Sequence, residues 1–218
     1  AAKMIARQKI NPFIIVAVWS SEERYREYFP EKAAENFTSA DLLLMDKVKK
    51  QKNIEKSDYL GDEYLLFLTS ELKPYIDKNY RTKPDAANTS ICGSSMGALI
   101  ALYAICEYPA VFGQAACIST HWPLLPGNSH MGPSEAIKKY ISQKLPDPQD
   151  HRIYFDHGTE TLDKYYEVHQ NTVDNILKFK GYTDKNWLTK KYEHAAHVEK
   201  SWQQRFDQVL FFLYKKDQ

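Results

Sequence analysis

One serine and two glycines stand at a spacing that is typical of nucleophilic catalysis. Gly93, Ser95 and Gly97 match the pattern Gly-x-Ser-x-Gly, in which a sharp turn between a strand and a helix presents the serine hydroxyl. Small residues on either side of the serine let neighbouring backbone pass close to the turn. The N-terminus of the following helix favours negative charge that develops beside the serine. The pattern therefore predicts a nucleophile at Ser95.

The residues around this short pattern strengthen the prediction. Residues 88–92 have the composition of a strand, and the apolar segment 98–105 predicts a helix that Tyr108 and Pro109 end. The alternative is a Gly/Ser turn that joins a strand to a helix and has no chemical role. A strand before the motif and a helix after it favour the nucleophile.

Alternating strand and helix patterns predict the fold class. Residues 13–19 form a continuous run of β-branched and aromatic residues, which is typical of a strand buried on both faces. Further strands are predicted at 88–92, 114–118, 152–155 and 187–192. Helices are predicted at 58–78, 98–105, 133–144, 163–180 and 198–214. This alternation indicates an α/β fold with a mostly parallel sheet, helices on both faces, and reactive groups at the carboxyl ends of the strands.

The length of the chain favours one domain over residues 1–218. Residues 20–57 are polar without a clear period, and we expect a long lid-like connection there with a helical turn or two. Pro74 is expected to distort the end of the helix at 58–78.

Composition limits the classes of partner. A net charge of +1 gives no sign of a nucleic acid partner, and no apolar run is long enough to span a bilayer. The chain begins at Ala1 rather than methionine, which is compatible with a removed signal peptide or a truncated start. The compartment therefore stays open between the cytoplasm and the periplasm or cell exterior, and the oligomeric state stays open too. The three cysteines are expected to be buried, reduced thiols.

A serine hydroxyl becomes a good nucleophile only when a base accepts its proton. Residues after the predicted strand at 152–155 offer three carboxylates, Asp156, Glu160 and Asp163. Residues after the last predicted strand offer two bases, His194 and His197. A metal site at these histidines is disfavoured because the His-Glu-x-x-His pattern and a third ligand are missing, so neither a metal nor another cofactor is predicted.

The chain resembles the putative esterase family of α/β-hydrolases, which includes proteins similar to enterochelin esterase, feruloyl esterase and S-formylglutathione hydrolase. The matching segments span most of the chain: 24–30, 67–76, 93–97 (Gly-Ser-Ser-Met-Gly), 154–158 (Tyr-Phe-Asp-His-Gly) and 197–205 (His-x-Glu-x-x-Trp-x-x-Arg). The Gly-Ser-Ser-Met-Gly form, followed by Tyr108-Pro109-x-x-Phe112, is much more specific than Gly-x-Ser-x-Gly alone.

The resemblance implies an α/β-hydrolase fold and a role for each candidate residue. Ser95 would be the nucleophile and His197 the base, with His194 as the alternative base. Asp163 would be the acid that orients the imidazole, with Glu160 as the alternative.

The resemblance also implies an oxyanion hole with two backbone donors. One would be the N–H group of Met96, directly after the nucleophile. The other would come from a loop after the third strand of the family. Residues 13–19 would be the fourth strand, so the N-terminal strands would be missing from this chain. We therefore expect a fragment, or a chain that pairs with a segment on another polypeptide.

The predicted function is hydrolysis of a small-molecule carboxylic ester through an acyl-enzyme. Trp19 and Trp122 are candidates for lining the substrate pocket. Two alternatives stay open: a non-catalytic binding or scaffold protein that retains the fold, and an acyltransferase that uses the same three residues. The identity of the alcohol part of the ester is not predicted.

Overall fold

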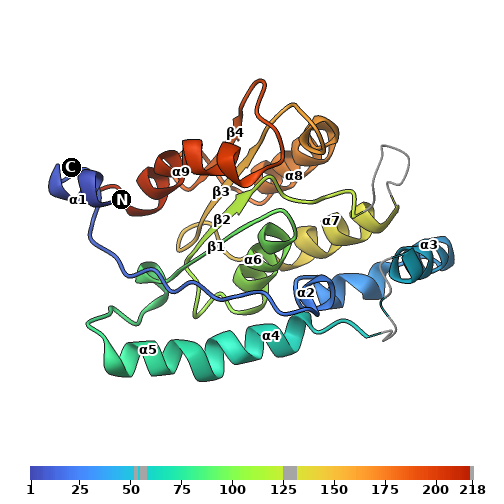
Figure 1. Ribbon diagram of the computed structural model, residues 1–218, viewed down its shortest axis with the longest axis horizontal. Helices are drawn as coiled ribbons and strands as arrows, with labels where there is room; N and C mark the ends of the chain where they lie inside the picture. The colour runs from blue at the N-terminus through green and yellow to red at the C-terminus, as the bar shows by residue number, and fades with distance from the viewer. Residues whose placement is uncertain (52–53, 55–57, 125–131, 217–218) are drawn as a thin grey trace.

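Four parallel strands form the sheet of this protein (Figure 1). The structure, a computed structural model, describes residues 1–51, 54, 58–124 and 132–216. The strands are β1 (Ser90–Ser94), β2 (Gln114–Ile118), β3 (Arg152–His157) and β4 (Trp187–Lys191). They lie in the order β1-β2-β3-β4, so every connection between neighbours is a crossover on one of the two faces. The predicted α/β class is confirmed, and so are the last four of the five predicted strands.

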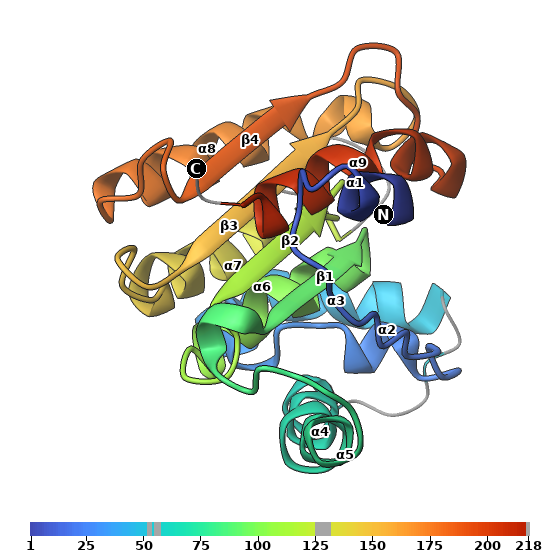
Figure 2. The same ribbon diagram turned by 90° about the vertical axis from the view of Figure 1, so that its left-hand side faces the viewer.

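Helices cover both faces of the sheet (Figure 2). The first face carries α6 (Met96–Glu107), α7 (Gly132–Lys144) and α8 (Glu167–Phe179), whereas α9 (Glu199–Tyr214) lies on the second. The short helix α1 (Ala2–Ala6) lies beside α9. Each face has its own core. Ala116 and Tyr154 of the sheet meet Val209 and Leu213 of α9 on the second face.

The nucleophile motif leads into the most apolar helix of the larger core. Ten of the twelve residues of α6 are buried, including Ala98, Ala101 and Ala104, whose small side chains permit close packing on β1 and β2. A helix that is apolar on every side must be covered on every side, and the sheet and α7 supply much of that cover. The start of α6, directly after Ser95, is therefore a rigid point of the fold.

A long helical segment spans residues 61–79. It consists of α4 (Gly61–Phe67), a π-helical turn η2 (Leu68–Leu72) and α5 (Lys73–Asn79). Pro74 has no N–H group to donate to the carbonyl oxygen of Ser70, so the regular α-helical ladder is interrupted just there. The predicted helix at 58–78 and its distortion near Pro74 are confirmed.

Residues 20–57 contain more helix than the sequence suggested. The segment contains α2 (Arg24–Glu27), η1 (Glu31–Asn36) and the 13-residue helix α3 (Ser39–Gln51). Two further short helices, η3 (Ala86–Asn88) and η4 (Asp163–Tyr165), lie elsewhere in the chain. Phe29 and Met45 from this region are buried in the larger core, so part of the segment is integral to the fold. A lid function for 20–57 stays a prediction. Residues 52–53 and 55–57 of this segment, and residues 125–131 before α7, lie outside the described residues.

The predicted strand at residues 13–19 is wrong. These residues belong to no strand, and Ile15 and Trp19 are 65% and 92% exposed. The start of the segment is anchored, because Ile10 forms a bridge with Lys215 and the ring of Phe13 stacks on Tyr214. A strand requires a hydrogen-bonding partner, and the nearest strand, β1, is separated from this segment by a groove.

The open side of β1 also explains which of the three cysteines are buried. Cys106 and Cys117 are buried free thiols, as predicted, but Cys92 is exposed because it lies on β1 at the open side of the sheet. Within the described part of the chain, no helix is both long and apolar enough to cross a bilayer.

Candidate active site

Ser95 occupies a strained turn at the end of β1. Its backbone angles are φ 58° and ψ −123°, a region that non-glycine residues rarely adopt. The Ser95 N–H donates to the carbonyl oxygen of Ile118 at 2.9 Å, which holds the turn against β2. A Cβ atom on Gly93 would lie 2.0 Å from the carbonyl oxygen of Gly97, whereas one on Gly97 would meet nothing within 4 Å. The first glycine of the motif is therefore required by packing.

Residues from three strand ends meet at this serine. His197, in the loop after β4, places Nε2 2.9 Å from Ser95 Oγ. Its Nδ1 lies 2.5 Å from Oδ1 of Asp163, which follows β3. The imidazole is 8% exposed and the carboxylate is fully buried. The structure thus brings together the three residues that the sequence analysis placed first for nucleophile, base and acid.

Two loops fasten the histidine in place. The carbonyl oxygen of Ala195 accepts hydrogen bonds from the N–H groups of Thr159 and Glu160, at 3.1 and 3.0 Å. The His197 N–H donates to Thr161 Oγ1 at 2.8 Å. A Cβ atom on Gly158 would lie 2.0 Å from the Ala195 carbonyl oxygen, so only glycine permits this approach. The loop after β3 therefore positions both the carboxylate and the histidine.

The carboxylate of Asp163 accepts three hydrogen bonds. Besides the contact with His197, its Oδ2 accepts the Ser119 hydroxyl at 2.6 Å and the Gly158 N–H at 2.6 Å. Burial raises the pKa of Asp163, but the three donors outweigh burial, and the pKa lies below its ordinary value. An ionised carboxylate at this position favours the tautomer of His197 that carries its proton on Nδ1.

Ser119 links this carboxylate to a buried ion pair. Its hydroxyl accepts hydrogen bonds from Arg205 Nη2 at 2.7 Å and Trp202 Nε1 at 3.0 Å. The same Arg205 Nη2 donates to Asp156 Oδ1 at 2.7 Å, and its Nε donates to Asp156 Oδ2 at 3.1 Å. Burial raises the pKa of Asp156 even with the guanidinium beside it. A buried hydrogen-bond network through Ser119 therefore supports Oδ2 of the Asp163 carboxylate.

Aromatic rings surround the imidazole. The rings of Tyr166 and Trp202 meet His197 edge to face, with centroid distances of 5.6 and 5.1 Å. Tyr166 also lies 2.7 Å from His121, between the phenol oxygen and Nδ1. Packing of this kind restricts the ring to one orientation and limits the access of water.

The alternative base His194 and the alternative acid Glu160 do not lie at Ser95. The His194 side chain is 90% exposed, and its Nδ1 lies 3.8 Å from a carboxylate oxygen of Glu160. The alternative base and alternative acid are thus near each other at the surface and separate from Ser95.

The two candidate tryptophans lie in opposite environments. Trp122 is fully buried, and its indole N–H donates to Gln170 at 3.1 Å, whereas Trp19 is almost fully exposed. These positions lend no support to substrate contacts by either tryptophan. Met96 is the first residue of α6, so its N–H group belongs to the first turn and has no intrahelical partner.

Sequence reasoning missed Ser119, which has no motif of its own. The segment 197–205 contains Trp202 and Arg205 at fixed positions after the histidine, and those residues now prove to contact Ser119. Among the described residues, no group of three histidine, cysteine or carboxylate side chains is arranged to hold a metal ion.

Solved structures similar to this one are esterases of the α/β-hydrolase type. The enterobactin esterase FES from Shigella flexneri, solved in the presence of 2,3-dihydroxy-N-benzoyl-glycine, has a TM-score of 0.65 and 18% identity, over 97% of this chain and 46% of that chain. The BES protein from Bacillus cereus has a TM-score of 0.61 and 17% identity, over 99% of this chain and 76% of that chain. At these identities the likeness shows the fold.

Curated relatives and a family model extend the comparison. The uncharacterized protein YbbA of Bacillus subtilis (strain 168) is 26% identical over 97% of this chain and 77% of its own length. An endo-1,4-beta-xylanase/feruloyl esterase of Xylanibacter ruminicola is 26% identical over 72% of this chain, which spans only 18% of that protein. The model described as "Putative esterase" matches residues 5–213. Because that match covers nearly the whole sequence, the chain belongs to the putative esterase family, as its resemblance implied.

Proposed function

We propose that this protein hydrolyses carboxylic esters through an acyl-enzyme, with Ser95 as nucleophile, His197 as general base and Asp163 as the acid. The observation that carries the proposal is the continuous chain of contacts from Ser95 Oγ through both imidazole nitrogens to the Asp163 carboxylate, at 2.9 and 2.5 Å. Membership of an esterase family supports hydrolysis of esters as the class of reaction.

The geometry supports an ordered transfer of one proton. With Nδ1–H donated to Asp163, the lone pair on Nε2 of His197 faces the Ser95 hydroxyl and accepts its proton as Oγ attacks the carbonyl carbon. The Asp163 carboxylate then stabilises the imidazolium. The negative charge on the former carbonyl oxygen is stabilised by the N–H group of Met96 and the start of α6.

Collapse of this tetrahedral species breaks the bond to the alcohol oxygen, and His197 returns the proton to that leaving group. Water then attacks the acyl-enzyme, with His197 again accepting the proton, and the second collapse releases the carboxylic acid and restores Ser95. Every proton that Nε2 accepts is returned, so the residues end in their starting state.

The substrate class that we propose is an ester with an aryl-acyl group. The support comes from relatives: one similar structure is titled as an enterobactin esterase solved with a dihydroxybenzoyl compound, and one curated relative is named a feruloyl esterase. Methyl ferulate and p-nitrophenyl acetate are suitable first substrates, because one carries an aryl-acyl group and the other does not.

Labelling with a fluorophosphonate probe tests the proposal. We expect one covalent adduct by intact mass, located on Ser95 by peptide mass spectrometry. The His197→Ala variant should lose the adduct, while the exposed His194→Ala variant should label like the wild type. Asp163→Asn should lower kcat by about 10⁴-fold, as in other enzymes with this arrangement. Glu160→Gln, on the same loop, should change it little.

Four results would contradict this proposal. Folded protein that takes no label would remove the enzymatic function, and labelling that persists without His197 would remove the proposed base. A loss in Glu160→Gln as large as in Asp163→Asn would assign the acid to the wrong carboxylate. An added alcohol acceptor that diverts the acyl group from water would indicate acyl transfer instead of hydrolysis.

A further inference from the structure

A second buried carboxylate lies behind the three proposed catalytic residues. Asp156, near the end of β3, is fully buried, and the Arg205 guanidinium of α9 donates to its two oxygens at 2.7 and 3.1 Å. The same guanidinium lies 4.0 Å from Oδ2 of Asp163, whose other oxygen contacts His197. One buried cation therefore stands between two carboxylates, and the nearer one takes no direct part in the proposed reaction.

The Arg205 guanidinium depends on Asp156 for its partners. Its Nη2 also donates to Ser119 Oγ, but its Nη1 is buried and has no acceptor among the described residues. A guanidinium does not lose its proton in proteins, so the positive charge at this point is fixed. Buried ion pairs seldom add stability over well-packed apolar side chains. The stability of the fold alone therefore does not account for this pair.

Four donors hold the Asp156 carboxylate in its charged form. Besides the two guanidinium nitrogens, the Ser119 N–H donates to Oδ1 at 3.2 Å, and the Tyr154 hydroxyl donates to Oδ2 at 3.0 Å. A carboxylate accepts all four of these hydrogen bonds, whereas a protonated carboxyl would have to turn one oxygen into a donor among donors. The charge of Asp156 is thus the form that its surroundings satisfy.

The net charge of this cluster changes during the proposed reaction. With a neutral imidazole, Asp156, Asp163 and Arg205 together carry one net negative charge. When His197 accepts the Ser95 proton, the imidazolium and the three charges sum to zero. If Asp156 were neutral, the same proton transfer would leave a net positive charge on these buried groups, which costs free energy.

We propose that Asp156 is a positioning residue for the base: by balancing the charge of Arg205, it stabilises the imidazolium that His197 forms during catalysis. Asp156 acts through Arg205 and Asp163 and does not touch the substrate. The inference rests on the proposed function and deepens it, because it adds a second carboxylate on which the rate depends. It also has a sign, since a guanidinium without Asp156 disfavours the imidazolium.

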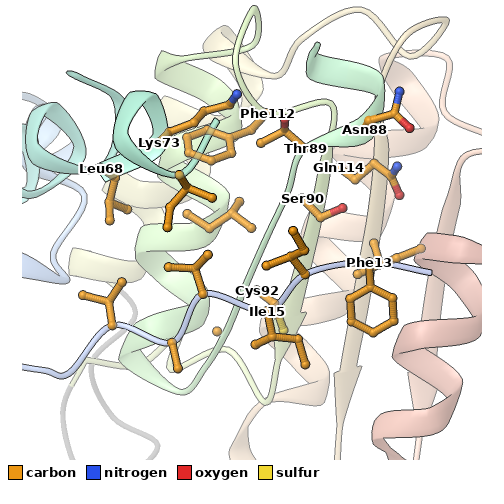
Figure 3. Close-up of a pocket in the computed structure, with 18 of the residues that line it drawn as sticks. Phe13, Ile15, Leu68, Lys73, Asn88, Thr89, Ser90, Cys92, Phe112 and Gln114 are labelled. Carbon is orange, nitrogen blue, oxygen red and sulfur yellow. The ribbon is translucent and has the colours of Figure 1, made fainter. Parts of the chain in front are cut away.

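Other titratable side chains face Asp156 or His197 from the surrounding segments. They are Cys92 (β1), Cys117 (β2), His121, Tyr154 (β3), Tyr166 and Tyr192. Ordinary thiols and phenols are neutral below about pH 8. Solvent also reaches Cys92, from the groove in Figure 3. All six side chains, His121 included, stay the same in the variants used below, so the comparison changes only the charges of Asp156 and Arg205.

The contacts at Asp163 allow the effect to be estimated. The guanidinium and the imidazole lie on two sides of this one carboxylate, at 4.0 and 2.5 Å from its oxygens. A unit charge about 8 Å away, at an effective dielectric constant of about 20, changes a protonation equilibrium by about 1.5 pH units. The acidic limb of a kcat/KM profile reports protonation of the base in the free enzyme. In Asp156→Asn this limb should move to lower pH by about 1–1.5 units, and kcat on the plateau should fall about tenfold.

The experiment measures kcat/KM for p-nitrophenyl acetate from about pH 5 to 9. In the double variant Asp156→Asn/Arg205→Gln, amides replace both charges, so the limb should return to its wild-type position. Arg205→Gln alone removes the cation, so its limb should lie at or above the wild-type pH. Asp207→Asn removes an exposed charge from the same helix α9 and should leave the limb in place.

Labelling of Ser95 by the fluorophosphonate probe is followed over the same pH range. Only folded chains react, and trimethylamine N-oxide favours the folded state, so the limb is also measurable in a destabilised variant. The same assay separates the two hypotheses. A wild type that takes no label would contradict the proposed function, whereas normal labelling with an unmoved limb in Asp156→Asn would contradict this inference alone.

Three results would overturn the role of Asp156. A limb within about 0.3 pH units of wild type in Asp156→Asn, even with a lower kcat, would mean that the residue only supports the structure. An equal displacement in the double variant would mean that geometry and not charge moves the limb. A displacement to lower pH in Arg205→Gln would have the wrong sign, because removing a positive charge cannot disfavour an imidazolium.

Discussion

Replacing Ser119 with alanine would test whether the network behind Asp163 positions the carboxylate for catalysis. A serine hydroxyl has one hydrogen to donate and two lone pairs that accept, and all three are used here. It donates to Asp163 and accepts from Arg205 and Trp202. The Ser119 side chain is fully buried, and the Asp163 and Arg205 side chains are buried too, so in Ser119→Ala water has no direct access to those two partners.

The loss in the free energy of unfolding can be estimated from the hydrogen bonds that each partner of Ser119 retains in the variant. Asp163 loses one of three donors, and a hydrogen bond to a charged group contributes about 1.5–3 kcal/mol. Arg205 keeps Asp156, and Trp202 is partly exposed and can bond to water, so their losses are smaller. We expect the free energy of unfolding to fall by about 2–4 kcal/mol. Because domains of this size have about 5–15 kcal/mol, the variant should stay folded.

The catalytic effect should appear in kcat. Without the Ser119 hydroxyl the carboxylate can shift, and a displacement of about 1 Å in a catalytic group costs about 100-fold. We therefore expect kcat for p-nitrophenyl acetate to fall by about 10- to 100-fold. KM should stay unchanged, because the Ser119 side chain is fully buried and has no surface with which to contact a substrate. Steady-state kinetics and urea unfolding measure the two effects.

The matched control is Ser142→Ala, a half-buried serine whose hydroxyl donates an exposed hydrogen bond to the Lys139 carbonyl oxygen of its own helix. It should change the free energy of unfolding by less than about 0.5 kcal/mol. Wild-type kcat in Ser119→Ala would refute the positioning argument, even if stability falls. A rise in KM at constant kcat would refute it too, because it would mean that Ser119 acts on substrate binding.

Two further predictions concern backbone packing and pH. Gly93→Ala should destabilise the protein by about 3 kcal/mol or more in urea unfolding, because its Cβ would meet a carbonyl oxygen at 2.0 Å, whereas Gly97→Ala should cost less than about 1 kcal/mol. Burial and the charge of Lys138 lower the pKa of His169 to about 4. The unfolded chain gains this proton near pH 6.5, so the free energy of unfolding should fall from pH 6.5 to 4, and His169→Gln should flatten that dependence.

Local signals explain why most of the fold could be predicted from the sequence. The helix α6 and the strand β2 are apolar runs with clear ends, and both formed where the pattern placed them. That the segments after β1, β3 and β4 approach one another followed from a rule of topology, since groups after parallel strands gather at one edge of a sheet. The choice of Asp163 over Glu160 and of His197 over His194 came from the family resemblance. No such rule identified Ser119. Its partners lie 44, 83 and 86 residues away in the sequence, and only the folded chain brings them together.

The wrong prediction of a strand at residues 13–19 has a different physical cause. The composition of a run such as Phe-Ile-Ile-Val-Ala-Val-Trp indicates that its side chains need apolar packing partners on both faces. It carries no information on whether a strand is available for its backbone, because that partner is encoded elsewhere. In this structure Ile14, Ile15 and Val16 are exposed and their backbone is unpaired. Such a run therefore forms a strand only where other residues supply both the apolar cover and the pairing partner.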